Sequence, residues 1–288
     1  MPADTKTAEA FASSWNNLPP GSVYTPAQFI DWFEPIQKSD IFGKEVLELG
    51  CGNASLAVHI LGWKPNRLEA VDLGSSVKSA EANLSSTGFS NWKVVQADLI
   101  DYRSSGFDVV YCIGVLHHLA VPSAGFNSVI RNTRPGGRFH CWVYAREGNR
   151  LIISVVDPLR KIASKLPWFI TKYFIASALV IPFFFYAKLL AFFSHIQRIK
   201  RTWLSGLLRK LPLCSYSLWI AERSFPFFLH VAFDQLVTPQ TDYISKDKIC
   251  AWLEKYPQIE KNSVYIIFRN GNSWKFGGRI SRDCGNPK

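Results

Sequence analysis

Residues 46–53 read V-L-E-L-G-C-G-N, and residues 70–73 read A-V-D-L. In the first stretch an apolar run ends in two glycines one residue apart, and in the second an apolar run ends in an acid. Gly50 permits a tight turn out of a strand, and Gly52 lets the backbone approach a ligand closely. Asp72 is placed to end the next strand, where a carboxylate can accept both ribose hydroxyls of an adenosyl group. The alternative interpretation is a tight turn and a chance acid.

Two further acids narrow the type of ligand. Asp98, in Q-A-D-L, ends a third apolar run and can accept a hydrogen bond from an adenine amino group. Ser55 stands where the dinucleotide fingerprint has its third glycine, which argues against a bound pyrophosphate. Glu48 is unfavourable beside a diphosphate and favourable beside a cation. The pattern predicts a cationic adenosyl ligand.

The region around these motifs alternates between short apolar runs and amphipathic segments, which is typical of an α/β fold with a parallel sheet. The run R-P-G-G at 134–137 predicts a turn into the fifth strand, and Ser245 is a candidate N-cap. We expect strands at 45–49, 67–72, 92–97, 107–113, 137–145 and 264–269, a last antiparallel strand from W-K-F-G-G-R-I, and helices at 26–33, 53–62, 75–87, 122–133 and 246–256.

Together, V-L-E-L-G-C-G-N, A-V-D-L, Q-A-D-L, F-D-V-V-Y-C-I-G-V-L-H-H-L and R-P-G-G resemble class I S-adenosylmethionine-dependent methyltransferases, most closely the branch with quinone and other small-molecule enzymes. The resemblance covers about residues 40–145 and returns at 240–280. It implies a Rossmann-like, seven-stranded, mostly parallel sheet with strand order 3-2-1-4-5-7-6, and S-adenosylmethionine as cofactor. It leaves the acceptor open.

The resemblance also implies roles for single residues around the cofactor. It places a glycine-containing loop around the methionyl part, the Asp72 carboxylate on the ribose and Leu73 near the adenine, with Asp98 and Leu99 as the adenine clamp. The residues after the fourth strand line the sulfonium. The cofactor set is Glu48, Gly50, Cys51, Gly52, Asn53, Asp72, Leu73, Asp98, Leu99, Cys112 and Ile113.

Two short segments supply the candidate residues for catalysis and for contact with the acceptor. His117 and His118 follow the fourth strand, and an imidazole there can accept the acceptor's proton near neutral pH. A structural or pocket-lining role is the alternative for both, since an acceptor that is already nucleophilic needs no base. After the fifth strand, the candidates for acceptor contact are Tyr144, Arg146, Glu147 and Asn149. Here the alternative is a solvated loop that pairs Arg146 with Glu147.

Composition separates one region from the rest. The chain of 288 residues carries a net charge of +11, and residues 150–223 alone hold twelve Lys/Arg against two acids, a net of +10. Long aromatic runs there predict three or four helices, bent at Pro167, Pro182, Pro212 and Pro226. We divide the chain into an N-terminal cap segment (1–40), a cofactor-binding core (41–146), a basic hydrophobic helical insert (147–240) and a C-terminal completion of the core (241–288).

The insert has three interpretations: a lid over an apolar acceptor, a surface that also contacts a membrane, or a transmembrane helix. The third is disfavoured because only fifteen residues, 173–187, lie between two lysines, whereas a span needs about twenty. The expected partner is a small or lipid-like acceptor. An RNA methyltransferase, whose basic insert binds phosphates, is the runner-up, and a non-catalytic cofactor-binding regulator is the third hypothesis.

The six cysteines form no C-x-x-C pair, so we expect reduced structural thiols and no metal. The N-terminal residues lack an apolar signal core, which predicts a cytoplasmic protein with peripheral membrane contact as one option. The sequence sets no oligomeric state.

Overall fold

The computed structural model describes residues 5–16, 23–104, 106–195, 206, 208 and 210–282. The chain divides into two units. The first comprises residues 1–144, 240–267 and 274–288, and the second comprises residues 145–239 and 268–273.

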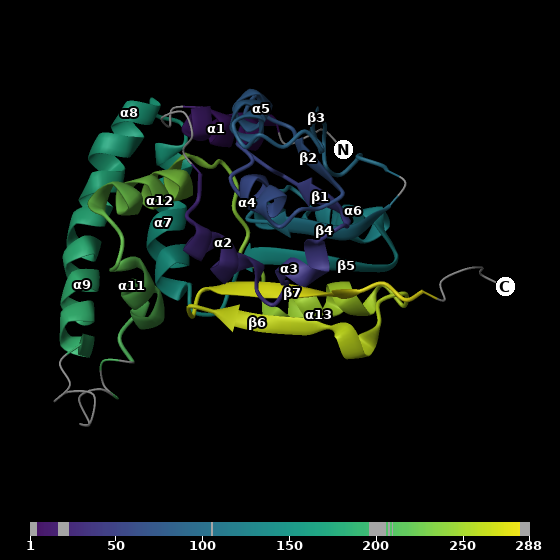
Figure 1. Ribbon diagram of the computed structural model, residues 1–288. Coiled ribbons are helices and arrows are strands. Elements are labelled where there is room, and N and C mark those ends of the chain that lie inside the picture. Colours follow the sequence, from purple (N-terminus) through teal and green to yellow (C-terminus); the bar gives the residue numbers. More distant parts are fainter. Residues whose placement is uncertain are drawn as a thin grey trace. The chain divides into compact units, whose positions relative to one another are not determined.

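A seven-stranded sheet forms the centre of the first unit, with strand order β3-β2-β1-β4-β5-β7-β6, which confirms the predicted order (Figure 1). β1 to β5 pair in parallel, and β6 and β7 are joined by a three-residue turn, so they run antiparallel and the sheet is mixed. The strands are β1 (Glu45–Leu49), β2 (Arg67–Asp72), β3 (Trp92–Gln96), β4 (Phe107–Ile113), β5 (Thr133–Tyr144), β6 (Tyr265–Arg269) and β7 (Ser273–Arg279).

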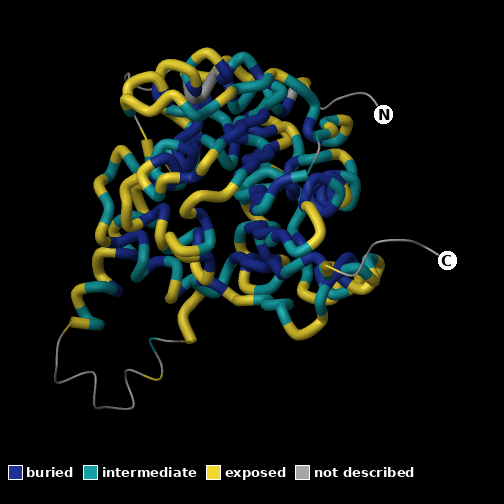
Figure 2. Tube along the Cα trace, turned by 45° about the vertical axis from the view of Figure 1, so that its right-hand side comes forward, coloured by how far each residue is buried: buried dark blue, intermediate teal, exposed yellow. Residues whose placement is uncertain are grey.

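The helices of the first unit connect and flank these strands, and most residues of β1, β4 and β5 are buried. Figure 2 shows how burial varies along the chain. The helices are α1 (Thr5–Asn16), α2 (Pro26–Phe33), α3 (Lys38–Ile41), α4 (Ala57–Gly62), α5 (Val77–Ser85), η1 (Leu116–His118), α6 (Pro122–Asn132), α13 (Lys246–Glu254) and η3 (Lys261–Ser263). The apolar inner strands β1 and β4 are almost fully buried, as expected for parallel strands covered on both faces.

Two helices, α2 and α13, begin at residues whose side chains accept a backbone N–H of the first turn. Ser245 is the N-cap of α13, and its side chain accepts from the backbone N–H of Lys248, which confirms the prediction. Thr25 and Gln28 form a capping box at α2: Gln28 donates its backbone N–H to Thr25 Oγ1, and Thr25 donates its own to Gln28 Oε1. The capping box at α2 was not predicted from the sequence, although T-P-A-Q at 25–28 carries its signature.

Two predicted boundaries are wrong. The helix expected at 53–62 begins only at Ala57, because residues 52–56 form turns and Ala54 takes a positive φ of 61°. R-P-G-G is not a turn before the fifth strand. β5 already begins at Thr133, and its register against β4 shifts between the Phe107–Thr133 and Val109–Arg138 pairs. The extra residues are taken up as an irregularity within the strand.

Register sets the rim of the sheet where the strands end. Leu49 pairs with Val71 and Glu48 pairs with Tyr111, so Gly50, Asp72 and the end of β4 arrive at the same edge. Asp72 pairs with Gln96, and Asp98 follows two residues later. The predicted strand-end acids therefore share the carboxyl rim of the parallel strands.

The second unit is helical. It contains α7 (Arg150–Ala163), α8 (Trp168–Ile170), the π-helical segment η2 (Thr171–Ala176), α9 (Ser177–His195), α11 (Cys214–Ile220) and α12 (Phe225–Val237). Pro167 and Pro226 stand at helix starts, where proline is favoured because its missing N–H has no helical partner.

One helix is longer than the sequence indicated. α8, η2 and α9 run on without a break from Trp168 to His195, and Pro182 lies inside α9. An 18-residue window of these 28 residues has a mean hydropathy of 2.0, and the helix is by length and composition sufficient to cross a membrane. The length argument against a span is therefore wrong, because the lysines at its two limits do not end the helix.

Candidate functional site

The glycine loop, residues 50–56, follows β1 and is held by the neighbouring strand. The backbone N–H groups of Gly50 and Cys51 both donate to the carbonyl oxygen of Val71, at 2.7 and 3.0 Å. Gly50 has a φ of 80°, and a Cβ there would lie 2.3 Å from a methyl carbon of Val115. Gly52 also has a positive φ, of 54°. Because α4 starts late, any ligand at this edge meets the backbone of the loop rather than a helix N-terminus.

Asp72 links this loop to the end of β2. Its Oδ2 accepts the backbone N–H of Gly52 at 2.8 Å, and its Oδ1 accepts the N–H of Gly74 at 2.9 Å and the hydroxyl of Ser76 at 3.3 Å. Burial raises the pKa of Asp72, and the backbone N–H donors oppose that rise. The backbone N–H of Leu73 also lowers the pKa of Asp72, and each carboxylate oxygen can accept two hydrogen bonds.

Glu48 lies beneath the rim, in the middle of the sheet. Its side chain is buried, and the Tyr111 hydroxyl donates to its Oε2 at 2.9 Å. Burial raises the pKa of Glu48 to about 8, an effect that the Tyr111 hydrogen bond opposes and the nearby Asp72 charge reinforces. Tyr111 was missed in the sequence. A tyrosine inside a buried strand needs a hydrogen-bond partner, and that requirement could have identified it.

The other residues predicted in the loop hold its shape. Asn53 is buried, and its side-chain oxygen accepts from the Ser55 N–H at 3.2 Å and the Ser55 hydroxyl at 2.6 Å. Its carbonyl oxygen accepts from the Asn83 side chain on α5 at 2.9 Å. Cys51 is buried beside this network, and burial raises the pKa of its thiol, so the group stays protonated. The contacts of Asn53 therefore join the loop to Ser55 and to α5.

The adenine-clamp candidates follow β3. Asp98 is half-buried, and its Oδ1 accepts the N–H of Ile100 at 2.8 Å, which closes a turn at the rim. Leu99 is buried, and its carbonyl oxygen accepts from the Ser128 hydroxyl on α6. Leu73 is half-buried at the end of β2. These three residues lie on the strand ends next to Asp72.

Cys112 and Ile113 close β4, where the sulfonium is expected. Cys112 is fully buried, and burial raises the pKa of its thiol. Ile113 is half-buried and packs against the main core of this unit. Among the described residues, five cysteines are free thiols and no group of three metal-ligating side chains occurs; Cys284 lies outside that part of the chain.

Both histidines lie in a ring of aromatic and backbone contacts. The His117 side chain is fully buried, with its ring 4.1 Å from the rings of His118 and Tyr144. His118 Nδ1 lies 3.1 Å from the carbonyl oxygen of Gln240 and 3.0 Å from the hydroxyl of Thr241. These contacts tie η1 to the segment that enters α13.

The candidates for acceptor contact fall into both units. Tyr144 ends β5 in the first unit, beside His117, and its ring stacks on that of Tyr243. Arg146 and Glu147 belong to the second unit, exposed and half-buried respectively. Asn149, also in the second unit, donates its side-chain amide to the carbonyl oxygens of Ala145 and Asn272, which stabilises the turn before α7.

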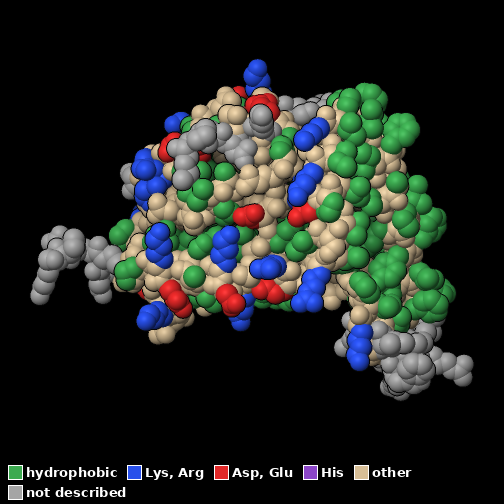
Figure 3. Space-filling model, turned by 180° about the vertical axis from the view of Figure 1, so that it is seen from behind, with side chains coloured by type: hydrophobic (Ala, Val, Ile, Leu, Met, Phe, Trp, Pro, Cys, Tyr) green, Lys and Arg blue, Asp and Glu red, His purple; other side chains and the backbone are tan. Residues whose placement is uncertain are grey.

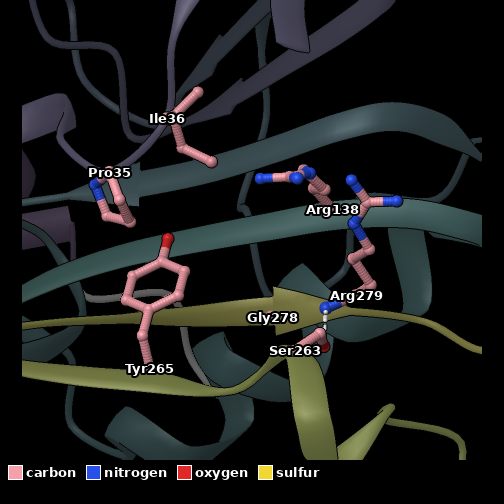
Figure 4. Close-up of a pocket in the computed structure, with 7 residues that line it drawn as sticks. All are labelled: Pro35, Ile36, Arg138, Ser263, Tyr265, Gly278 and Arg279. Atoms are coloured by element: carbon pink, nitrogen blue, oxygen red, sulfur yellow. Dashed lines mark hydrogen bonds between the residues drawn. The ribbon is translucent and has the colours of Figure 1, made fainter.

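The first unit contains a cavity of about 140 Å³. Figure 4 shows its lining, in which Arg138 and Arg279 lie together and the Tyr265 hydroxyl points inward. Arg138 pairs with Asp40 at 3.3 Å, and the Tyr265 hydroxyl lies 2.7 Å from His140 Nδ1. None of the lining residues belongs to the predicted site: Pro35, Ile36, Arg138, Ser263, Tyr265, Gly278 and Arg279. The cavity is therefore separate from the glycine loop and its acids.

Residues 47–139 match a protein family described as a methyltransferase domain, and this range contains the glycine loop, Asp72, Asp98 and both histidines. These residues form a class I methyltransferase domain.

Curated relatives match part of the chain. The chain is similar to a ubiquinone biosynthesis O-methyltransferase of Pseudomonas syringae pv. tomato, 25% identical over 130 residues, which cover 44% of this chain and 55% of that one. The protein with the same description from Thiobacillus denitrificans is 31% identical over 118 residues, covering 39% and 48%. The chain thus spans about half the length of these curated relatives.

Solved structures with similar folds include a SAM-dependent methyltransferase from Thiobacillus denitrificans in complex with S-adenosyl-L-homocysteine. That structure has a TM-score of 0.41 and 15% identity, and the match covers 51% of this chain and 61% of that one. Magnesium protoporphyrin IX methyltransferase from Synechocystis PCC 6803, with bound SAH, has a TM-score of 0.44 and 13% identity, covering 83% and 75%.

Proposed function

We propose that this chain transfers a methyl group from S-adenosylmethionine to a small apolar or lipid-like acceptor. The observation that carries the proposal is the Asp72 carboxylate, which joins the glycine loop to the end of β2 within the methyltransferase domain. The names of the curated relatives favour a small-molecule acceptor such as a quinone precursor.

The residues of the rim fit an adenosyl cation. Asp72 Oδ2 accepts the N–H of Gly52, and a carboxylate oxygen can accept two hydrogen bonds, which suits a ribose hydroxyl. Glu48 offers a carboxyl group that a nearby positive charge would favour in its ionised form. Asp98 lies two residues past the strand that pairs with Asp72, as an adenine contact requires.

The bound cofactor supplies a methyl group already activated by its sulfonium leaving group. The chain then has to bind and orient the two reactants and exclude water. The positioned loop and the buried carboxyls serve the first of these tasks. One cluster on the first unit contains Tyr144, His117 and His118. Contact of these residues with the acceptor stays a prediction, as does a role of either histidine as general base.

Asp72→Ala tests the cofactor assignment. We expect the dissociation constant for S-adenosylmethionine to rise by roughly thirtyfold, about 2 kcal/mol, because a hydrogen bond to a charged group is lost. Isothermal titration calorimetry measures this, and Asp101→Ala, which removes an exposed carboxylate one strand away, is the matched control. Asp72→Asn keeps a side-chain oxygen and serves if the alanine variant does not fold.

Unchanged affinity in a folded Asp72→Ala protein would contradict the ribose assignment. Transfer of a labelled methyl group then separates the functional alternatives. Label in the solvent-extractable small molecules of a cell extract supports the proposal, whereas label in RNA contradicts it. Cofactor binding without transfer to either pool would instead support a non-catalytic regulator.

A further inference from the structure

The helix that runs from Trp168 to His195 has two different faces. Val180 and Ala187 on α9 are buried in one apolar cluster with Ile220 of α11 and Phe228 of α12. The side of α9 that carries them is therefore covered by protein, and this packing fixes which side of the helix points outward.

The opposite side is an exposed apolar stripe. Its large members are Phe174, Ile181, Phe185, Leu189 and Phe192, with 69%, 48%, 67%, 56% and 63% of each residue exposed. The spacings of four, four and three residues place Ile181, Phe185, Leu189 and Phe192 on one face of α9, and Phe174 lies ahead of them in η2. The stripe extends for about 27 Å, at 1.5 Å per residue. Outward faces of helices in water are normally polar, so an outward face made of large apolar side chains is unusual.

Figure 3 shows the same feature as a continuous surface. Turning the view by 180° places α9 at the right-hand edge, where hydrophobic side chains gather along its length. Further apolar side chains that are at least two-fifths exposed lie at its start, Trp168, Phe169 and Tyr173. An apolar surface of this extent marks an interaction site.

Cations accompany the stripe, and acids are scarce. Lys188 lies on α9 at the flank of the stripe, exposed, and its Nζ donates to the Ala221 carbonyl oxygen at 2.6 Å. Lys161 and Lys165 are exposed ahead of α8. Residues 150–223 carry a net charge of +10 with only two acids. A surface of aromatic and aliphatic side chains with flanking lysines complements an anionic lipid surface.

We propose that the α8–α9 helix docks in the plane of an anionic membrane, with the stripe in the boundary between head groups and acyl chains. The inner face of α9 is already occupied by α11 and α12, so lipid reaches only the outer face. Lys188 also favours this placement. In a spanning helix it would lie within the hydrocarbon, whereas in the plane its amine stays near the head groups. The inference does not depend on the proposed enzymatic activity.

Vesicle flotation of the full chain tests the proposal, without cofactor or acceptor. The vesicles contain phosphatidylcholine alone or phosphatidylcholine with phosphatidylglycerol. We expect flotation with the anionic vesicles, weakened by salt because exposed charges are screened. Phe185→Glu should reduce the bound fraction about tenfold or more, because a phenyl group that enters the membrane is replaced by a negative charge that the anionic lipid repels. Phe42→Glu, at a residue 60% exposed in the first unit, is the matched control and should bind as wild type.

Several outcomes would overturn the proposal. One is wild-type protein that stays unbound with both vesicles; another is equal binding by the Phe185→Glu variant with an unchanged circular dichroism spectrum. A dimer that light scattering detects in the wild type and not in Phe185→Glu, without vesicle binding, would assign the stripe to a second copy of the chain. Protein in cell membranes that only detergent, and not alkaline carbonate, releases would indicate a spanning helix instead.

Discussion

At the rim of the sheet, the Glu48 carboxyl group is buried, the Asp72 carboxyl group is half-buried, and each has defined donors. On the outer face of the helix from Trp168 to His195, phenyl groups are exposed and the charges lie beside them. Glu48 and Asp72 together accept from Tyr111, two backbone N–H groups and a serine hydroxyl. Phe174 and Phe185 are each about two-thirds exposed. Polar groups at the rim are shielded from water, whereas apolar groups on the outer face of the helix are exposed to water. Burying a carboxyl group requires hydrogen-bond donors, and an exposed apolar stripe requires a partner that covers it.

Gly50→Ala should give the largest effect, because it disturbs the rim through the backbone. The new Cβ would lie 2.3 Å from Val115, and the residue would be held at a φ of 80°. We expect the free energy of unfolding to fall by about 4 kcal/mol, from left-handed strain and overpacking together. Urea denaturation measures this value.

Gly43→Ala is the matched control for that change. Gly43 has a φ of 67°, but a Cβ added there would meet nothing within 4 Å, so only the backbone strain applies, about 1–2 kcal/mol. Equal losses for the two variants would show that Val115 yields and that the loop is not held as tightly as the contacts indicate. Val115→Ala combined with Gly50→Ala should recover the steric part.

These residues also show how far sequence reasoning reached. Gly50, Asp72 and Asp98 were predicted because each ends an apolar run, and parallel strands end at one edge of their sheet. Tyr111, Gly74 and Ser76 were not predicted, because their contacts with Glu48 and Asp72 depend on register between strands and on the path of a loop. The start of α4 was missed because Ala54 takes a positive φ that alanine rarely adopts.

In the second unit, composition predicted helices but not their limits. Prolines and lysines interrupt the apolar runs of the sequence, yet Pro182 and Lys188 both lie inside α9. A proline removes one backbone hydrogen bond, and α9 nevertheless continues through Pro182 and packs against α11 and α12. Periodicity could not show which face was exposed, because α9 is apolar all round.

Glu48→Gln tests the protonation of the buried carboxyl group, and we expect a smaller effect on the free energy of unfolding than for Gly50→Ala. Because burial raises the pKa of Glu48 to about 8, the folded protein holds a proton that the unfolded chain releases above its ordinary value near 4.5. Stability from this group is complete below about pH 4.5 and is lost as pH rises through about 8. Wild type should lose on the order of 2 kcal/mol across this range by urea denaturation, and the variant should lose less.

Glutamine keeps an oxygen that can accept from Tyr111, so the comparison isolates the ionisable group. Asp72 also has a raised pKa and titrates in the same direction, so the variant should show a reduced slope rather than a flat profile. Parallel profiles for wild type and Glu48→Gln would show that Glu48 is ionised in the folded protein. The buried side of the comparison would then rest on Asp72 alone.

The smallest effect is expected on α9, where two adjacent phenylalanines differ only in the face that they occupy. Phe185→Ser should change the free energy of unfolding by no more than about 0.5 kcal/mol, since two-thirds of the residue is already in water. Phe184 is half-buried, with its ring edge-to-face against Phe225 and Phe228, so Phe184→Ser should cost several times more. Thermal melts in detergent-free buffer compare the two. If Phe185→Ser proved as costly as its neighbour, the outer face would be covered by protein in solution, and a lipid surface would no longer be needed to explain it.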